Sequence, residues 1–345
     1  CPQRVCVSCG LPWRRKPHRQ LGELAVTGSL TPTCDCTADH QPGLVLDPYF
    51  TATKAEWLLT EGGLEPGPDT ALGTVDSWIV WTLSQGALHV TDPTNAALTG
   101  LLVPEATGWD DAVLDRLRIP RSALPEVVDS VGVVGPATAL DGAPPIAGIA
   151  GDQQASLAGQ GCFSPGDAKA TFGTGGMLDV CTGSTPPITP ERGEHGSFPI
   201  VTWSTAAGSM WGREAIMLSA GSAVEWLSDD LGVVADPRAT AAAAAAVDDS
   251  DGVWFVPALL GMATPQWDFG ARGSLFGLTR GTTAGHLVRA VLDGIAHRGV
   301  DLIEAAEADS DIAVDAVRVD GGMSTNPLFV QLFADLAGRA IEVSP

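Results

Sequence analysis

The residues of this sequence best suited to chemistry lie in three short loops, each of which follows an apolar segment. The first loop is Gly-Asp-Gln-Gln at 151–154, after the apolar run at 146–150. Glycine lets a ligand approach the backbone closely, and a carboxylate at a strand end facing a cleft is well placed as a general base. Asp152 is therefore a candidate base. The alternative is that Asp152 only caps a helix that begins at Gln153.

The second loop is Thr-Phe-Gly-Thr-Gly-Gly at 171–176, after a strand that we expect at 168–172. In such a loop, successive backbone N–H groups and a threonine hydroxyl can bind anionic oxygens, here around Thr174 and Gly175. The pattern is neither a P-loop nor the dinucleotide-binding fingerprint. A tight hairpin with its glycines at positive φ would account for the same residues without a ligand, and both interpretations stay open.

The third loop is Asp-Gly-Gly-Met-Ser-Thr-Asn-Pro at 320–327, between a strand expected at 314–319 and a helix expected at 327–337. Gly322 would let a flat or anionic ligand lie against the backbone near the helix N-terminus. Asn326 is also an expected N-cap, with proline at the first helical position. Capping and ligand contact are compatible, so the loop is a candidate for both.

These loops can act together only if the fold brings them to one place. Segments with helical periodicity alternate along the chain with apolar runs typical of buried strands. The expected helices are 53–59, 75–83, 112–117, 213–228, 286–306 and 327–337, and the expected strands are 146–150, 168–172 and 314–319. This alternation predicts an α/β architecture.

A break rich in glycine, with one proline, at 158–166 predicts a boundary between two domains. The loop with the carboxylate lies before this boundary and the two glycine loops lie after it. The arrangement predicts a nucleotide held between the domains. Phosphoryl transfer needs such a site, because the phosphates must be positioned, water must be excluded and a base must lie near the nucleophile.

At this point the sequence resembles the FGGY carbohydrate kinases, collinearly from about residue 43 to residue 345. The segments that carry the resemblance, in family order, are Leu-Asp-Pro-Tyr-Phe (46–50), Gly-Thr-Val-Asp-Ser-Trp (73–78), Gly-Asp-Gln-Gln (151–154), Phe-Gly-Thr-Gly (172–175), Ala-Arg-Gly (271–273), Gly-Leu-Thr-Arg-Gly (277–281) and Asp-Gly-Gly (320–322). The resemblance implies the actin/hexokinase-type fold. Two RNase H-like α/β domains would hold ATP and substrate in the cleft between them, with the N-terminal domain incomplete here.

The resemblance also implies roles for individual residues. Within the family, the sequence is most similar to members that phosphorylate glycerol. Asp152 matches the catalytic base and a substrate contact, and Gln153 and Tyr49 match further glycerol ligands. The residues that match the ATP-binding side are Thr174, Gly175, Gly221, Glu225, Gly322 and Asn326. ATP and Mg²⁺ are the implied cofactors.

Two of these residues also have an explanation without a ligand, and a third differs from the residue that is usual in the family. Tyr49, the only tyrosine of the chain, would also fit as a half-buried aromatic residue. Gly221, inside an otherwise good helical pattern, would also fit close helix packing. Glu225 stands where the glycerol-phosphorylating members usually have glutamine, which puts its contact with the nucleotide in doubt.

The segment 1–40 differs from the rest of the chain. Its net charge is +2. The net charge of the whole chain is −22, so the remaining residues carry −24. Five of the seven cysteines fall in it: Cys1, Cys6, Cys9, Cys34 and Cys36. One interpretation is that 1–40 is not native to the fold, through a shifted reading frame or a misassigned start. The other is a zinc site in a regulatory segment, although Cys-X-Cys is an unusual half of such a site.

The expected domain organisation follows from these observations. Residues 1–40 form a non-matching segment, 41–160 the remainder of the FGGY N-terminal (substrate) domain, and 161–345 the C-terminal (nucleotide) domain, shortened at its end. The family's first phosphate loop, of the Asp-Gln-Gly-Thr-Thr type, is not found in this sequence. Neither is the Arg-Glu pair expected upstream of Tyr49. The chain is therefore expected to be incomplete.

Composition restricts the partners. A net charge of −22 argues against binding of nucleic-acid backbones, which need basic patches. No apolar run reaches the roughly 20 residues of a membrane span, and no secretory signal is apparent, so a cytoplasmic location is expected. Adaptation to high salt and a GC-rich genome account for the scarcity of lysine equally well. Whether copies of the chain form a homo-oligomer is left open.

The function that these observations predict is ATP-dependent phosphorylation of a small molecule, glycerol, to glycerol 3-phosphate, with Asp152 as the general base. One alternative is a kinase of the same family for another polyol or a ketose. The other is a truncated, non-catalytic fragment that binds nucleotide.

Overall fold

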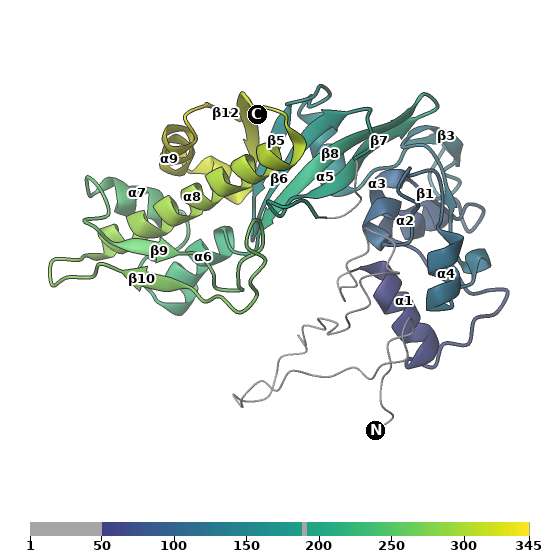
Figure 1. Ribbon diagram of the computed structural model, residues 1–345, viewed down its shortest axis with the longest axis horizontal. Coiled ribbons are helices and arrows are strands. Elements are labelled where there is room, and N and C mark those ends of the chain that lie inside the picture. Colours follow the sequence, from purple (N-terminus) through teal and green to yellow (C-terminus); the bar gives the residue numbers. More distant parts are fainter. Residues whose placement is uncertain (1–49, 188–191, 345) are drawn as a thin grey trace.

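The computed structural model describes residues 50–187 and 192–344. Figure 1 shows the N-terminal part, in purple and blue, and the C-terminal helices, in green and yellow, on opposite sides of a central sheet. Tyr49 and the segment 1–40 lie outside the described residues, so the predictions that concern them are not addressed by the structure. Within the described parts of the chain, no helix is both long and apolar enough to cross a bilayer.

The central sheet has six strands in the order β12-β11-β5-β6-β8-β7. Their bounds are β5 (Ala168–Phe172), β6 (Gly176–Gly183), β7 (Phe198–Thr205), β8 (Gly208–Met217), β11 (Ala316–Asp320) and β12 (Ala340–Val343). Strands β12, β11 and β5 pair in parallel, whereas β5, β6, β8 and β7 pair antiparallel. Strand order and directions agree with the RNase H-like sheet that the resemblance implies.

Two long helices cover one face of this sheet, α8 (Ala284–Ser310) and α9 (Pro327–Ala337). The core beneath them includes Phe172 of β5, whose ring meets Phe329 and Phe333 of α9 edge to face, with centroids 5.0 and 5.2 Å apart. Gly299 lets α8 approach this cluster, because a Cβ there would lie 2.7 Å from the Phe333 ring. Alternate residues of β5 therefore belong to the core, and the others face the opposite side.

The opposite face of the sheet is covered by α5 (Asp152–Gly159). Ser156 of α5 and Gln160, the C-cap residue directly after it, both donate hydrogen bonds to Asp320 Oδ2, at 2.7 and 2.8 Å. Leu157 lies with two buried cysteines, Cys162 and Cys181. The helix that carries Asp152 is thus fixed to the sheet that carries both glycine loops.

The remaining C-terminal elements are short. They are α6 (Gly221–Glu225), η3 (Trp226–Asp230), α7 (Ala239–Ala245), β9 (Trp254–Val256), β10 (Ser274–Phe276) and η4 (Gly322–Thr325). The helix expected at 213–228 is wrong in its first third: residues 213–217 belong to β8, and helix begins only at Gly221. Pairing with strands on both sides overrides the helical pattern of this segment.

The N-terminal part contains small elements around its own core. They are α1 (Thr51–Thr60), α2 (Val75–Leu83), α3 (Pro93–Ala96), η1 (Ala97–Thr99), α4 (Asp111–Leu117), η2 (Arg121–Ala123) and the strand pairs β1 (Val90–Thr91) with β2 (Glu126–Val127) and β3 (Val131–Pro136) with β4 (Pro145–Gly148). Leu101, Trp109 and Leu114 are buried together. By contrast, Val75 and Trp78 of α2 are 75% and 69% exposed, so no described element covers that face of the helix.

Candidate functional site

The two glycine loops leave the sheet side by side. Strands β5 and β11 are parallel neighbours, and Thr171 pairs with Asp320 near their carboxyl ends. The loops that follow therefore emerge at the same edge of the sheet. Gly321 has φ +86°, and a Cβ there would lie 2.5 Å from the Phe172 carbonyl oxygen, so the second loop crosses directly over the end of β5.

The loop after β5 is held by close backbone contacts. The Gly221 N–H donates to the Gly173 carbonyl at 2.8 Å, and the N–H groups of Ala220 and Ser222 donate to the Thr174 carbonyl. A Cβ on Gly221 would lie 2.5 Å from the Gly173 oxygen. Close packing thus accounts for Gly221, and it packs the start of α6 onto the candidate phosphate loop.

The glycines of this loop are not there for a positive φ. Gly173, Gly175 and Gly176 all lie outside the left-handed region, so the hairpin interpretation is wrong on that point. They are needed for proximity: a Cβ on Gly175 would lie 2.7 Å from the Met217 carbonyl oxygen. Within the described residues, the N–H groups of Thr174 and Gly175 make no hydrogen bond, and the Thr174 side chain is exposed. These donors are available to an anionic ligand.

The loop after β11 combines capping with an open surface. Asn326 Oδ1 accepts hydrogen bonds from the N–H groups of Leu328 and Phe329, at 3.1 and 3.2 Å, which confirms the predicted N-cap of α9. Gly322 is exposed, and a Cβ there would meet nothing within 4 Å. Packing within the described residues therefore does not require glycine at this position.

Asp152 lies at the start of α5, and the structure does not support its role as a helix cap. Gly151 is the N-cap residue, with no side-chain capping bond, and Asp152 is the first helical residue. Its Oδ1 accepts only from the Gln153 N–H, at 2.9 Å, and the side chain is exposed. A carboxylate at this position interacts favourably with the helix dipole while leaving an oxygen available to a ligand.

A buried network holds the Asp152 loop from behind. The Gly151 N–H donates to Thr94 Oγ1 at 2.8 Å, and the Thr94 hydroxyl donates to Asp92 Oδ1 at 2.8 Å. Asp92 is fully buried and also accepts from Ser130. The start of α5 is therefore tied to the N-terminal part as well as to the sheet.

Gln153 is fixed by a lysine for which we made no functional prediction. Lys169 of β5 is fully buried, and its ammonium donates to Gln153 Oε1 at 2.6 Å and to Thr171 Oγ1 at 2.9 Å. It also lies 3.0 Å from Asp179 Oδ2, in an ion pair whose two side chains are both inaccessible. One signal was available in the sequence, because Lys169 is a lysine inside an apolar strand of a chain that has three lysines.

Acidic groups extend this cluster across the sheet. Glu214 of β8 is the cross-strand neighbour of Asp179. Burial, reinforced by the charges of Asp179 and Asp152 and opposed by Lys169, raises the pKa of Glu214 to about 8. Burial also raises the pKa of Asp179, against the effect of Lys169. Near neutral pH, Glu214 is thus largely protonated.

The remaining predicted residue lies at the edge of this region. Glu225 is the last residue of α6 and is exposed. It stands four residues after Gly221, a spacing at which two positions share one face of a helix. The structure thus brings Thr174, Gly175, Gly221, Gly322 and Asn326 to one edge of the sheet, and it joins Gln153 to the face beside them.

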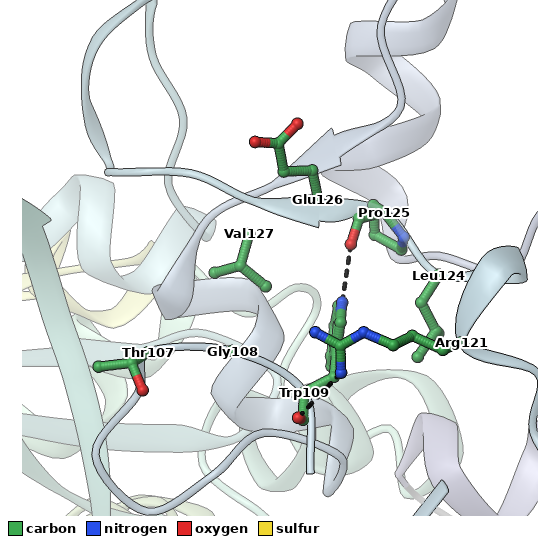
Figure 2. A pocket seen from close by; sticks show the side chains of 8 residues that line it. All are labelled: Thr107, Gly108, Trp109, Arg121, Leu124, Pro125, Glu126 and Val127. Atoms are coloured by element: carbon green, nitrogen blue, oxygen red, sulfur yellow. Dashed lines mark hydrogen bonds between the residues drawn. The ribbon is translucent and has the colours of Figure 1, made fainter. Parts of the chain in front are cut away.

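A separate cavity of about 320 Å³ lies in the N-terminal part. Figure 2 shows its lining, from Thr107 to Val127, with Trp109 Nε1 donating to the Pro125 carbonyl at 2.7 Å. It contains none of the predicted site residues. In the described ranges, no group of three or more His, Cys, Asp or Glu side chains could hold a metal ion.

The fold and the two loops define the class of protein by its architecture, the two-domain fold of the actin/hexokinase type. More particularly, the chain belongs to the FGGY family of carbohydrate kinases. The model of the family's N-terminal domain matches residues 37–159, and that of its C-terminal domain matches residues 168–345. These matches confirm the resemblance that we drew from the motifs, and with it the fold class.

The chain is similar to several glycerol kinases and, in structure, also to xylulose kinases. The chain is 46% identical to glycerol kinases of Burkholderia pseudomallei, over 86% of this chain and 60% of that protein, and of Aromatoleum aromaticum, over 95% and 68%. The solved structure of Plasmodium falciparum glycerol kinase with ADP is similar with a TM-score of 0.78 at 29% identity, covering 88% of this chain and 61% of that one. The structure of a xylulose kinase from Brucella ovis is similar with a TM-score of 0.74 at 25% identity, covering 86% of this chain and 60% of that one. The chain thus spans roughly three fifths to two thirds of the length of these relatives.

Proposed function

We propose that this protein transfers the γ-phosphoryl group of ATP to glycerol, giving glycerol 3-phosphate. The proposal is supported by relatives named glycerol kinase at 41–46% identity. The single structural observation that carries it is the hydrogen bond between Lys169 and Gln153. It ties the residue beside Asp152 to β5, the strand whose loop presents the free N–H groups of Thr174 and Gly175.

Each of these residues has a task in the proposed reaction. Gln153 and Tyr49 bind glycerol, with one hydroxyl within hydrogen-bonding reach of Asp152. Asp152 accepts the proton of that hydroxyl as its oxygen attacks the γ-phosphorus in line. The N–H groups of Thr174 and Gly175 stabilise the negative charge on the transferred group. Mg²⁺ enters with ATP as part of the substrate and neutralises phosphate charge.

The nucleotide side is proposed to follow the edge of the sheet. Gly221 brings the start of α6 against the phosphate loop, and Gly322 offers a surface without a side chain on which the adenosine part of ATP can lie. Asn326 and Glu225 border the same edge. The proposal assigns the substrate to the domain at 41–160 and the nucleotide to the domain at 161–345. It also includes a cytoplasmic location.

Replacing Asp152 with asparagine tests the role of the base. The amide keeps the shape of the side chain but cannot accept the proton, so kcat should fall by about 10²–10⁴-fold. Calorimetric binding of ATP should stay within a factor of about two, because Asp152 is not on the nucleotide side. Unchanged kcat in the variant would refute the assignment. Asp141→Asn, at an exposed aspartate between β3 and β4, is the matched control for loss of a carboxylate and should leave kcat unchanged.

The alternatives are separated by substrate profiling. Glycerol, other polyols and ketoses such as xylulose would be tested as acceptors, with this chain and with a form extended to the length of the relatives. Preference for a ketose would replace glycerol in the proposal. Nucleotide binding without transfer to any acceptor in either form would favour a non-catalytic nucleotide-binding protein.

A further inference from the structure

The ammonium of Lys169 has an environment that a strand lysine rarely has. It is completely inaccessible, and three acceptors surround it: Gln153 Oε1 at 2.6 Å, Thr171 Oγ1 at 2.9 Å and Asp179 Oδ2 at 3.0 Å. A buried ammonium is costly unless it is paired, and Asp179 supplies that pairing. Gln153 is the one member of this group that belongs to α5 and lies next to Asp152.

From this geometry we infer that Lys169 is a positioning residue for the acceptor substrate. By holding Gln153 Oε1, it turns the amide nitrogen of Gln153 toward the substrate, so that Gln153 serves as a hydrogen-bond donor to a substrate oxygen. The inference rests on the proposed function and deepens it, because it states which atom of Gln153 meets the acceptor and what fixes that atom.

The chemistry of lysine determines the orientation of the amide. An ammonium has three donors and no acceptor, whereas an amide side chain has one oxygen and one NH₂ group. Only the oxygen of Gln153 can face Lys169, since the opposite rotamer would place NH₂ against NH₃⁺. Within the described residues, Gln153 Nε2 makes no hydrogen bond, and it is not among the buried polar atoms without a partner. That donor is therefore accessible to a ligand.

Removing both partners of the ion pair together should preserve the fold. Replacing a buried pair with apolar residues of similar volume is often neutral or stabilising, whereas removing one partner leaves an uncompensated charge. Lys169→Met alone would leave Asp179 unpaired and would destabilise the fold. The double variant Lys169→Met/Asp179→Leu removes both charges, so it should fold while losing the contact with Gln153.

The test compares this double variant with Arg298→Met. Arg298 of α8 is also a buried cation, 6% exposed, but it bonds the Thr264 carbonyl and Asp301, away from Gln153. In the double variant, the KM for glycerol should rise about tenfold, the size of one ordered hydrogen bond to the substrate. The KM for ATP should change by less than about twofold, because uniform loss of acceptor binding leaves the nucleotide side intact. In the control, neither KM should change.

An unchanged KM for glycerol in a folded double variant would overturn the inference, as would equal increases in both KM values. If the unmodified protein instead phosphorylates another acceptor, glycerol is wrong and the same comparison is made with that acceptor. If it phosphorylates none, the proposed function fails, and the side-chain amide of Gln153 is observed by ¹⁵N NMR. Greater mobility of the Gln153 amide in the double variant than in the unmodified protein, measured by ¹⁵N relaxation of Nε2, would support the role of Lys169. Identical relaxation in both proteins would refute it.

Discussion

Glu214 should make the free energy of unfolding of this protein fall as the pH rises. The substitution Glu214→Gln should remove this dependence. The side chain is buried in β8 next to Asp179, and its pKa is raised from 4.5 to about 8. Below pH 4.5 the carboxyl is protonated in both the folded and the unfolded chain, and the pKa difference has no effect. Between pH 4.5 and about 8 the unfolded chain releases this proton and the folded chain keeps it. The free energy of unfolding therefore falls as the pH rises through this window.

The size of the effect follows from the same interval. One pH unit of difference corresponds to about 1.4 kcal/mol, so the whole window could cost at most about 5 kcal/mol. Relaxation around a buried carboxyl reduces such values, and we expect about 2–4 kcal/mol. Glu214→Gln removes the titrating proton while keeping one donor and one acceptor. The variant and the unmodified protein should be similarly stable near pH 5, and the variant should gain the advantage up to about pH 8.

Urea unfolding followed by tryptophan fluorescence, at pH values from 5 to 9, measures this difference. The pH profile of Glu342→Gln serves as the baseline, because it removes a carboxylate from the same sheet at a position where the side chain is 58% exposed. Parallel profiles of Glu214→Gln and the unmodified protein would refute the reasoning. A difference that grows below pH 5 instead of above it would do the same.

Two substitutions separate packing from ligand contact at the edge of the sheet. Gly221→Ala should lower the free energy of unfolding by about 1–3 kcal/mol, because its Cβ would lie 2.5 Å from the Gly173 carbonyl oxygen. It should also raise the KM for ATP, because the loop is displaced. Thermal melting measures the first effect and steady-state kinetics the second. Gly322→Ala should leave the melting temperature within about 2 °C, since nothing lies within 4 Å, but should weaken ATP binding in calorimetry; unchanged affinity would remove Gly322 from the proposed site.

The sequence allowed correct prediction of the elements whose signals are local. The helix at 327–337 has the predicted bounds, because asparagine at the cap and proline at the first position mark its start. The strand at 168–172 also has its predicted bounds. Proximity of the two glycine loops was expected from the function that they share. The structure gives the physical reason, which is the parallel pairing of β5 with β11.

Individual glycines could not be interpreted from sequence in the same way. Gly321 needs a left-handed φ, Gly175 needs space beside Met217, and Gly322 has no steric requirement within the described residues. All three occur in similar Gly-rich strings. Which requirement applies depends on atoms that are distant in the sequence. Only the folded chain therefore distinguishes a glycine required by close packing from one that leaves space for a ligand.

The buried cluster of Lys169, Asp179 and Glu214 shows how an error in secondary structure can prevent prediction of a buried acid. The short loop after Phe172 pairs that residue with Gly176, and antiparallel register then places Lys169 opposite Asp179. Counting back three residues on each side of the predicted hairpin would therefore have found the ion pair. Glu214 could not be found this way, because its segment has the pattern of a helix start, and on a helix it would face no strand. The same tertiary pairing that turned 213–217 into β8 also buries Glu214 beside Asp179 and raises its pKa. The error in secondary structure and the missed acid therefore have one cause, and the pH profile of Glu214→Gln tests its energetic consequence.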